Sequence, residues 1–205
     1  MAEAKLSHLR QDFDRRILLS MKLVSDVETL PIHRRQIEAV AEAAFLRMFM
    51  SWEGFLEESF LRYLIGAKAP CGYCPRRLVS VTKIETARSL VCANRTVGYV
   101  RWNVAAEVRN RAKTYFIDGE PYWGALASTT SEINEMNIVR NRITHDSHIA
   151  QERFGELITD AYGYRIKGMT PGRFLLSPMK GLSKSMRNLN RYATILQGAS
   201  ARIIN

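Results

Sequence analysis

The segment from Pro31 to about Ile65 limits most strongly what this chain can fold into. Its apolar side chains recur at helical spacing and cover much of the helix surface, as the following residues show: Ile37, Val40, Ala44, Phe45, Met48, Phe49, Trp52, Phe55, Leu56, Phe60, Leu61 and Leu64. Pro31 suits a first helical turn, and Gly66 and Pro70 end the pattern. The segment therefore predicts one long helix that is buried over much of its surface.

The rest of the chain also shows helical periodicity. We expect helices over residues 3–27, from Ser128 or Thr130 to about 145–147, over 149–162, and after Gly181, with shorter ones over 80–92 and 98–113. Residues 66–77 and 118–128 are expected to be loop or turn, and 163–170 a short connection or hairpin. No segment alternates with period two, so the sequence predicts an all-α helical bundle.

Length and composition narrow the class of protein. The chain has 205 residues, of which 46% are hydrophobic and 24% charged, values that exclude a disordered or fibrous protein. No apolar run approaches the roughly 20 residues of a membrane-spanning helix, and the N-terminus lacks the apolar region of a secretory signal. We expect a soluble, cytoplasmic protein with a single domain over 1–205 and no membrane partner.

The formal charge of +10 is unevenly distributed along the chain. Residues 1–70 are balanced, 71–115 carry +7, 116–160 carry −5, and 161–205 carry +8 without any acidic residue. A basic surface fits a polyanion, since each neutralised phosphate releases counterions, and RNA is the partner that the charge favours. The alternative is a solvated basic surface that serves only solubility.

Several common chemistries find no support. The sequence contains no P-loop, no dinucleotide-binding glycine pattern, no HExxH and no GxSxG. Cys71 and Cys74 form a CxxC pair, but only Cys92 remains as a further cysteine, so a zinc site would need a distant ligand such as His33. The sequence favours reduced loop cysteines, and neither a metal nor another cofactor is expected.

A more specific pattern lies in residues 138–148, Ile-Val-Arg-Asn-Arg-Ile-Thr-His-Asp-Ser-His. Arg140 is followed directly by Asn141 and, five positions on, by His145. The other Arg-Asn pairs have no histidine at that spacing, because Arg109-Asn110 leads to Thr114 and Arg187-Asn188 leads to Tyr192. The combination is therefore moderately specific.

The residue types suit cleavage of RNA. An arginine can clamp a phosphate with bidentate hydrogen bonds, and a histidine can accept or donate a proton at neutral pH. On an ideal helix Arg140 and His145 point about 140° apart, so they converge only if the helix ends or bends near His145. A purely structural interpretation stays open, in which His145 caps the helix and Arg140 pairs with Glu135 or Asp146.

The segment Val139–His145 resembles the Arg-x4–6-His signature of HEPN domains, in which a polar residue often follows the arginine. The predicted helix around Phe49–Glu58 is similar to that of the RiboL-PSP/MAE branch. The resemblance implies an all-α bundle in which Arg140 and His145 are catalytic and Asn141 orients His145 or the phosphate. It also implies a supporting role for Glu53. His148, with Arg142, offers a second imidazole.

The resemblance further implies a homodimer, and the chemistry points the same way. Transesterification needs a base and an acid, which two copies of His145 in one cleft would supply. The leading hypothesis is a metal-independent endoribonuclease of a toxin–antitoxin or antiviral system, with an antitoxin or regulator as a further partner. The alternative is a non-catalytic HEPN-like dimer that binds RNA or a partner protein.

Five basic residues are candidates for contact with RNA: Arg142, Lys180, Lys184, Arg187 and Arg191. Arg142 lies within the motif segment 138–148, and the other four lie in the basic C-terminal segment 161–205. Residues 66–125 are interpreted as a possible insertion of loops and short helices. Trp102 and Trp123 could stack on bases, whereas Trp52 is expected in the core because it lies within the apolar stretch of the long helix.

Overall fold

The structure is a computed structural model that describes residues 6–93, 100–178 and 186–205. The described residues are helical and contain no β-strand, which confirms the predicted all-α class. The elements follow one another as α1 (Leu6–Glu28), α2 (Arg34–Leu64), α3 (Ile84–Ala93), α4 (Ala105–Tyr115), the short 3₁₀ helix η1 (Ile117–Gly119), α5 (Tyr122–Ala127), α6 (Thr130–Thr144), α7 (His148–Tyr162), α8 (Pro171–Leu176) and α9 (Asn188–Ile203).

The long helix α2 begins at a capping box. The ring Nδ1 of His33 accepts a hydrogen bond from the backbone N–H of Arg35 at 3.2 Å, and the side chain of Gln36 accepts one from the backbone N–H of His33 at 3.0 Å. These bonds satisfy amides that the first turn of a helix otherwise leaves without partners. The helix therefore starts three residues after Pro31, and His33 has a structural role at its N-terminus.

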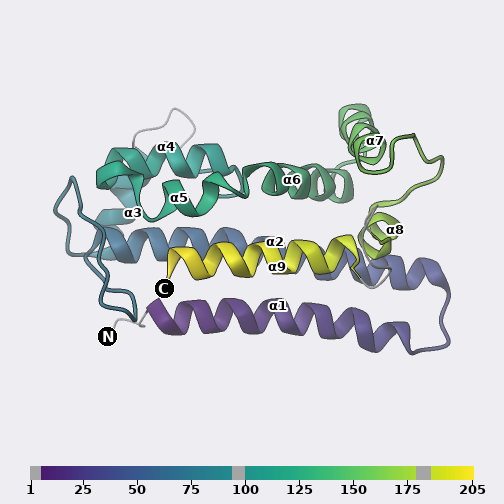
Figure 1. Ribbon diagram of the computed structural model, residues 1–205, viewed down its shortest axis with the longest axis horizontal. Helices are drawn as coiled ribbons and strands as arrows, with labels where there is room; N and C mark the ends of the chain where they lie inside the picture. The colour runs from purple at the N-terminus through teal and green to yellow at the C-terminus, as the bar shows by residue number, and fades with distance from the viewer. Residues whose placement is uncertain (1–5, 94–99, 179–185) are drawn as a thin grey trace.

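The helices form two layers with an extension at one end (Figure 1). Helices α1, α2 and α9 run side by side along the long axis, while α3, α4, α5 and α6 lie over α2. Helix α7 follows α6, and α8 packs against the N-terminal half of α2. The C-terminal end of α6 therefore lies next to α7.

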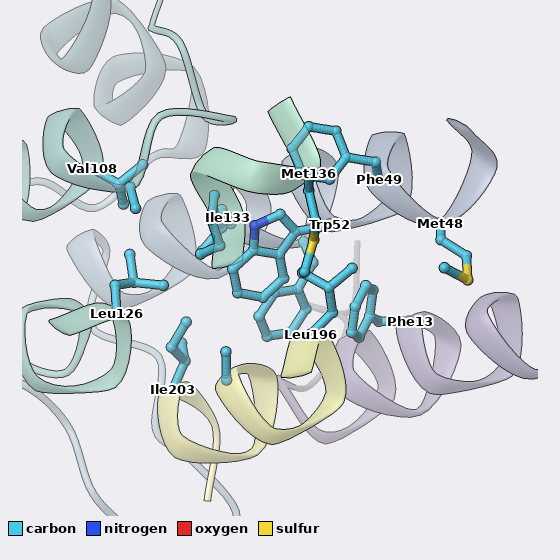
Figure 2. Close-up of a cluster of buried hydrophobic side chains, with 14 of the residues drawn as sticks. Phe13, Met48, Phe49, Trp52, Val108, Leu126, Ile133, Met136, Leu196 and Ile203 are labelled. Carbon is cyan, nitrogen blue, oxygen red and sulfur yellow. The ribbon is translucent and has the colours of Figure 1, made fainter. Parts of the chain in front are cut away.

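Trp52 stands at the centre of one continuous core (Figure 2). Its indole is fully buried among side chains of α1, α6 and α9, including Phe13, Met136 and Leu196. The ring centroids of Phe13 and Trp52 are 5.9 Å apart. Because helices from all parts of the chain bury side chains together, Trp52 has the core position that the sequence predicts.

Residues 66–125 contribute to the same core. Phe116 and Tyr122 are fully buried against Phe60 of α2, with ring centroids 5.0 and 5.1 Å from it. The hydroxyl of Tyr122 donates a hydrogen bond to Ser59. Phe116 and Tyr122 therefore belong to the core of the bundle.

Some elements and boundaries that the sequence predicts are wrong. Residues 118–128, predicted as a turn, contain helix α5, whose buried stripe of Tyr122, Ala125 and Leu126 is too short to show in the sequence. Helix α8 lies in a stretch for which no helix was predicted, and with six residues it is as short as α5. The N-cap of α6 is Thr129, which makes no side-chain capping bond, and neither Ser128 nor Thr130 takes that place.

Candidate active site

Helix α6 is oriented by three buried side chains. Ile133, Met136 and Val139 lie at spacings of three residues and face the core, where Ile133 and Met136 stand beside Trp52 (Figure 2). This packing leaves Arg140 and Asn141 half-buried on the flank of the helix, while the side chains from residue 144 to 149 are exposed. The core thus fixes which way the motif residues face.

Arg140 and Asn141 are joined directly. The guanidinium Nη1 of Arg140 donates a hydrogen bond to Oδ1 of Asn141 at 3.1 Å. The backbone carbonyl of Asn141 accepts the N–H of His145 at 2.9 Å, and the carbonyl of Arg140 accepts the hydroxyl of Thr144 at 3.0 Å. Asn141 therefore orients the arginine, and the histidine is tied to the same turn through its backbone.

His145 is the residue at which α6 ends. Its backbone is extended, with φ −134° and ψ 125°, and its ring is exposed. The helix thus terminates where the sequence predicts. Within the described residues the imidazole of His145 forms no hydrogen bond or ion pair, with Arg140 or with any other residue. The histidine is available to solvent or to a ligand.

Arg140 and Asn141 line an open cavity of about 780 Å³, which we call the mixed cavity. Its other charged residues are Glu53 of α2, Arg101 before α4, and Arg153 and Glu156 of α7; Trp102 forms part of its wall. Burial raises the pKa of Glu53 above its ordinary value, and the positive charge of Arg140 opposes this rise. Glu53 and Arg140 thus line the same cavity and interact through their charges, and no ion pair joins them within the described residues.

The second arginine and histidine of the motif segment are engaged by acids. Nη1 of Arg142 donates to Oδ1 of Asp146 at 3.1 Å, and Nδ1 of His148 lies 3.3 Å from a carboxylate oxygen of Glu152. His148 belongs to the first turn of α7, and its side chain is 80% exposed. Arg140 and His145 are therefore the less constrained pair for chemistry.

The C-terminal candidates for RNA contact differ in their freedom. Arg187 donates to Glu28 at 2.5 Å, and Arg191 donates to Glu135 at 2.6 Å, so each cation already has a carboxylate partner. Lys180 and Lys184 lie outside the described residues. An RNA phosphate would have to displace a carboxylate to bind Arg187 or Arg191.

Arg153 was not singled out from the sequence, and Trp102 was named there only as a residue that could stack on bases. Both line the mixed cavity, and Arg153 forms no ion pair among the described residues. Neither residue belongs to a spacing pattern, because one precedes α4 and the other lies on α7. Only the packing of these elements around α6 brings them to Arg140.

The described part of the chain offers no group of three or more His, Cys, Asp or Glu side chains that could hold a metal ion. Cys71 is exposed, and Cys74 and Cys92 are half-buried; all three are free thiols. Among the described residues, none of the helices has the length and apolar character needed to cross a membrane.

Comparison of the chain with protein-family models, curated proteins and solved structures finds no match.

Proposed function

We propose that the chain is a metal-independent endoribonuclease that uses Arg140 and His145. The observation that supports this most directly is the end of α6, where Arg140, oriented by Asn141, lines an open cavity and His145 stands exposed one turn later. A permanent cation with two donor groups and an unengaged imidazole are the functional groups that phosphodiester cleavage requires.

The reaction follows from these groups. The imidazole of His145 accepts the proton of a ribose 2′-hydroxyl, and the 2′-oxygen forms a bond to the adjacent phosphorus. Arg140 stabilises the charge that develops on the phosphorane oxygens. The bond to the 5′-oxygen then breaks, and this leaving oxygen takes up a proton. The products are a 2′,3′-cyclic phosphate and a free 5′-hydroxyl.

The leaving oxygen needs an acid, and among the described residues at this helix end His145 is the histidine without an ion-pair partner. We propose that His145 of a second copy donates this proton in a homodimer whose cleft contains both motifs. A monomer at micromolar concentration by gel filtration with light scattering, if it still cleaves RNA, would refute the dimeric scheme.

An assay in EDTA tests the activity. Wild type should cleave RNA, and His145→Ala and Arg140→Ala should each reduce the rate by at least about 10²-fold, in line with the loss of a general base or a charge-stabilising donor. His8→Ala, which removes an exposed histidine on α1, is the matched control and should keep the full rate. The His145→Ala protein should still bind RNA.

Two outcomes separate this proposal from its alternative. Equal behaviour of all four proteins would leave a non-catalytic HEPN-like module that binds RNA or a partner protein. Growth arrest on expression of the wild type, relieved by His145→Ala, would support a toxin or antiviral role, in which an antitoxin or regulator restrains the enzyme in the cytoplasm.

A further inference from the structure

A second cavity lies on the other side of α7, between this helix and the loop that leads to α8. It has a volume of about 580 Å³, and we call it the basic cavity because its charged lining residues are Arg142, Arg165 and Lys167. No acidic residue lines it. The cavity thus concentrates positive charge, in contrast to the mixed cavity.

Two of the three cations are free to bind an anion. Arg165 and Lys167 are exposed and form no ion pair within the described residues. The guanidinium of Arg165 lies over Gly155 of α7, 3.5 Å from the position that a Cβ there would occupy. The guanidinium therefore packs against α7 at residue 155, where it forms part of the cavity wall.

The third cation is positioned by an acid at the rim. Arg142 donates to Asp146, whose carboxylate also accepts a hydrogen bond from Gln151 at 2.9 Å. The side chain of Asp146 is 84% exposed, so water screens its charge. The pair fixes the direction of Arg142 and offsets only part of the positive charge of the cavity.

The floor of the cavity strengthens the attraction for an anion. Phe154 and Ile158 of α7 are 4% and 2% exposed, and both line the basic cavity. Apolar walls exclude water and concentrate the electric field of the cations around them. A phosphate group at this place would meet two free cations, Arg165 and Lys167, and the acid-paired Arg142, next to a hydrophobic wall.

The basic cavity begins where the motif ends. Arg142 follows Arg140 by two residues, and its Nη1 also lies 3.5 Å from the backbone carbonyl oxygen of His145. Arg140 and Arg142 are about 200° apart around α6, so the basic cavity lies on the opposite flank of the helix from the mixed cavity and borders the end of the motif at His145.

From this arrangement, and resting on the ribonuclease function proposed above, we propose that the basic cavity binds a backbone phosphate of the RNA next to the cleaved linkage. Arg165 and Lys167 are then binding residues that hold the substrate and do not take part in the proton transfers. The same chemistry could bind a free phosphate or a mononucleotide, and the experiment separates these ligands.

The test measures binding of a labelled single-stranded RNA by fluorescence anisotropy over a series of salt concentrations. All proteins carry His145→Ala, so that the RNA remains intact. The logarithm of the RNA-binding constant falls linearly with the logarithm of the salt concentration. In the double variant Arg165→Gln with Lys167→Gln this fall should be less steep by about 1.4, because two phosphate contacts are lost. Binding should also weaken about tenfold at moderate salt. Arg173→Gln with Lys68→Gln removes the same charge from exposed positions outside the cavity and should keep the original slope.

The outcomes distinguish this inference from the proposed function. Equal slopes for the two double variants would overturn the assignment of the basic cavity. Competition by inorganic phosphate or a mononucleotide at the same concentration of phosphate groups as RNA would show a small-anion site and overturn the RNA assignment. RNA binding that depends on Arg165 and Lys167, together with a wild type that cleaves no RNA, would retain this site and refute the nuclease.

Discussion

The two sides of helix α7 differ in the charges they present. Toward α6 the helix contributes Arg153 and Glu156 to the mixed cavity, where Glu53 lies across from them. Toward the loop before α8 it contributes the neutral Gln151 and Gly155, and the surrounding cations meet no acid in the lining. Arg153 and Gly155 are about 200° apart around the helix, so one short segment serves both environments.

This difference shows that the charge of a segment does not predict the field at its surface. Residues 161–205 contain no acid, yet Arg187 and Arg191 are matched by Glu28 and Glu135 from distant parts of the chain. Arg165, from the same segment, forms no ion pair within the described residues and lies beside Gly155 of α7. The position of each cation among its neighbours decides whether it can bind an anion.

The largest effect is expected on stability, at the residue through which α7 packs against the core. Phe154 is 4% exposed and packs edge-on against Phe174, with ring centroids 5.8 Å apart. Phe154→Ala should lower the free energy of unfolding by about 3–5 kcal/mol, because it leaves a cavity beneath α7. Urea denaturation measures this, with Ile149→Ala, on an exposed residue of the same helix, as the control. Equal losses for the two variants would show that α7 is not anchored through Phe154.

A carboxylate placed in the basic cavity should make the two sides of α7 more alike in charge. Gly155→Asp puts an acid beside the guanidinium of Arg165, where it competes with phosphate. RNA affinity should fall about tenfold, equivalent to about 1.4 kcal/mol. Gly155→Ala is the neutral control, since its Cβ makes only ordinary contact with Arg165 at 3.5 Å. Anisotropy with the His145→Ala background measures both, and similar affinities for the two variants would contradict the assignment.

A smaller, pH-dependent effect is expected on the opposite side. Burial holds the pKa of Glu53 above its ordinary value of 4.5, so the folded protein takes up this proton at a higher pH than the unfolded chain. Ionised Glu53 therefore lowers stability as the pH rises through the raised pKa. Glu53→Gln should be more stable than wild type at pH 7, and the difference should vanish below pH 4.5. Thermal unfolding over this pH range measures the effect, and a difference that grows at acid pH would refute it.

Much of the fold could be predicted from periodicity. Helices α1, α2, α6 and α7 lie close to the expected ranges because each carries a long apolar stripe that the core requires. Helices α5 and α8 were missed because six residues give too short a stripe. Met186, expected within the last helix, precedes α9 and is 41% exposed. Leu182, expected there too, lies outside the described residues.

The candidate site divides in the same way. The sequence by itself determined the spacing of Arg140, Asn141 and His145 and the end of their helix, because these depend on neighbouring residues along one turn. Only the tertiary structure decided that Glu53 faces the same cavity as Arg140, and that Arg165 is free within the described residues whereas Arg191 is paired. The reason is physical: hydrogen bonds within a turn are local, whereas the neutralisation of a charge depends on groups that packing brings from distant parts of the chain.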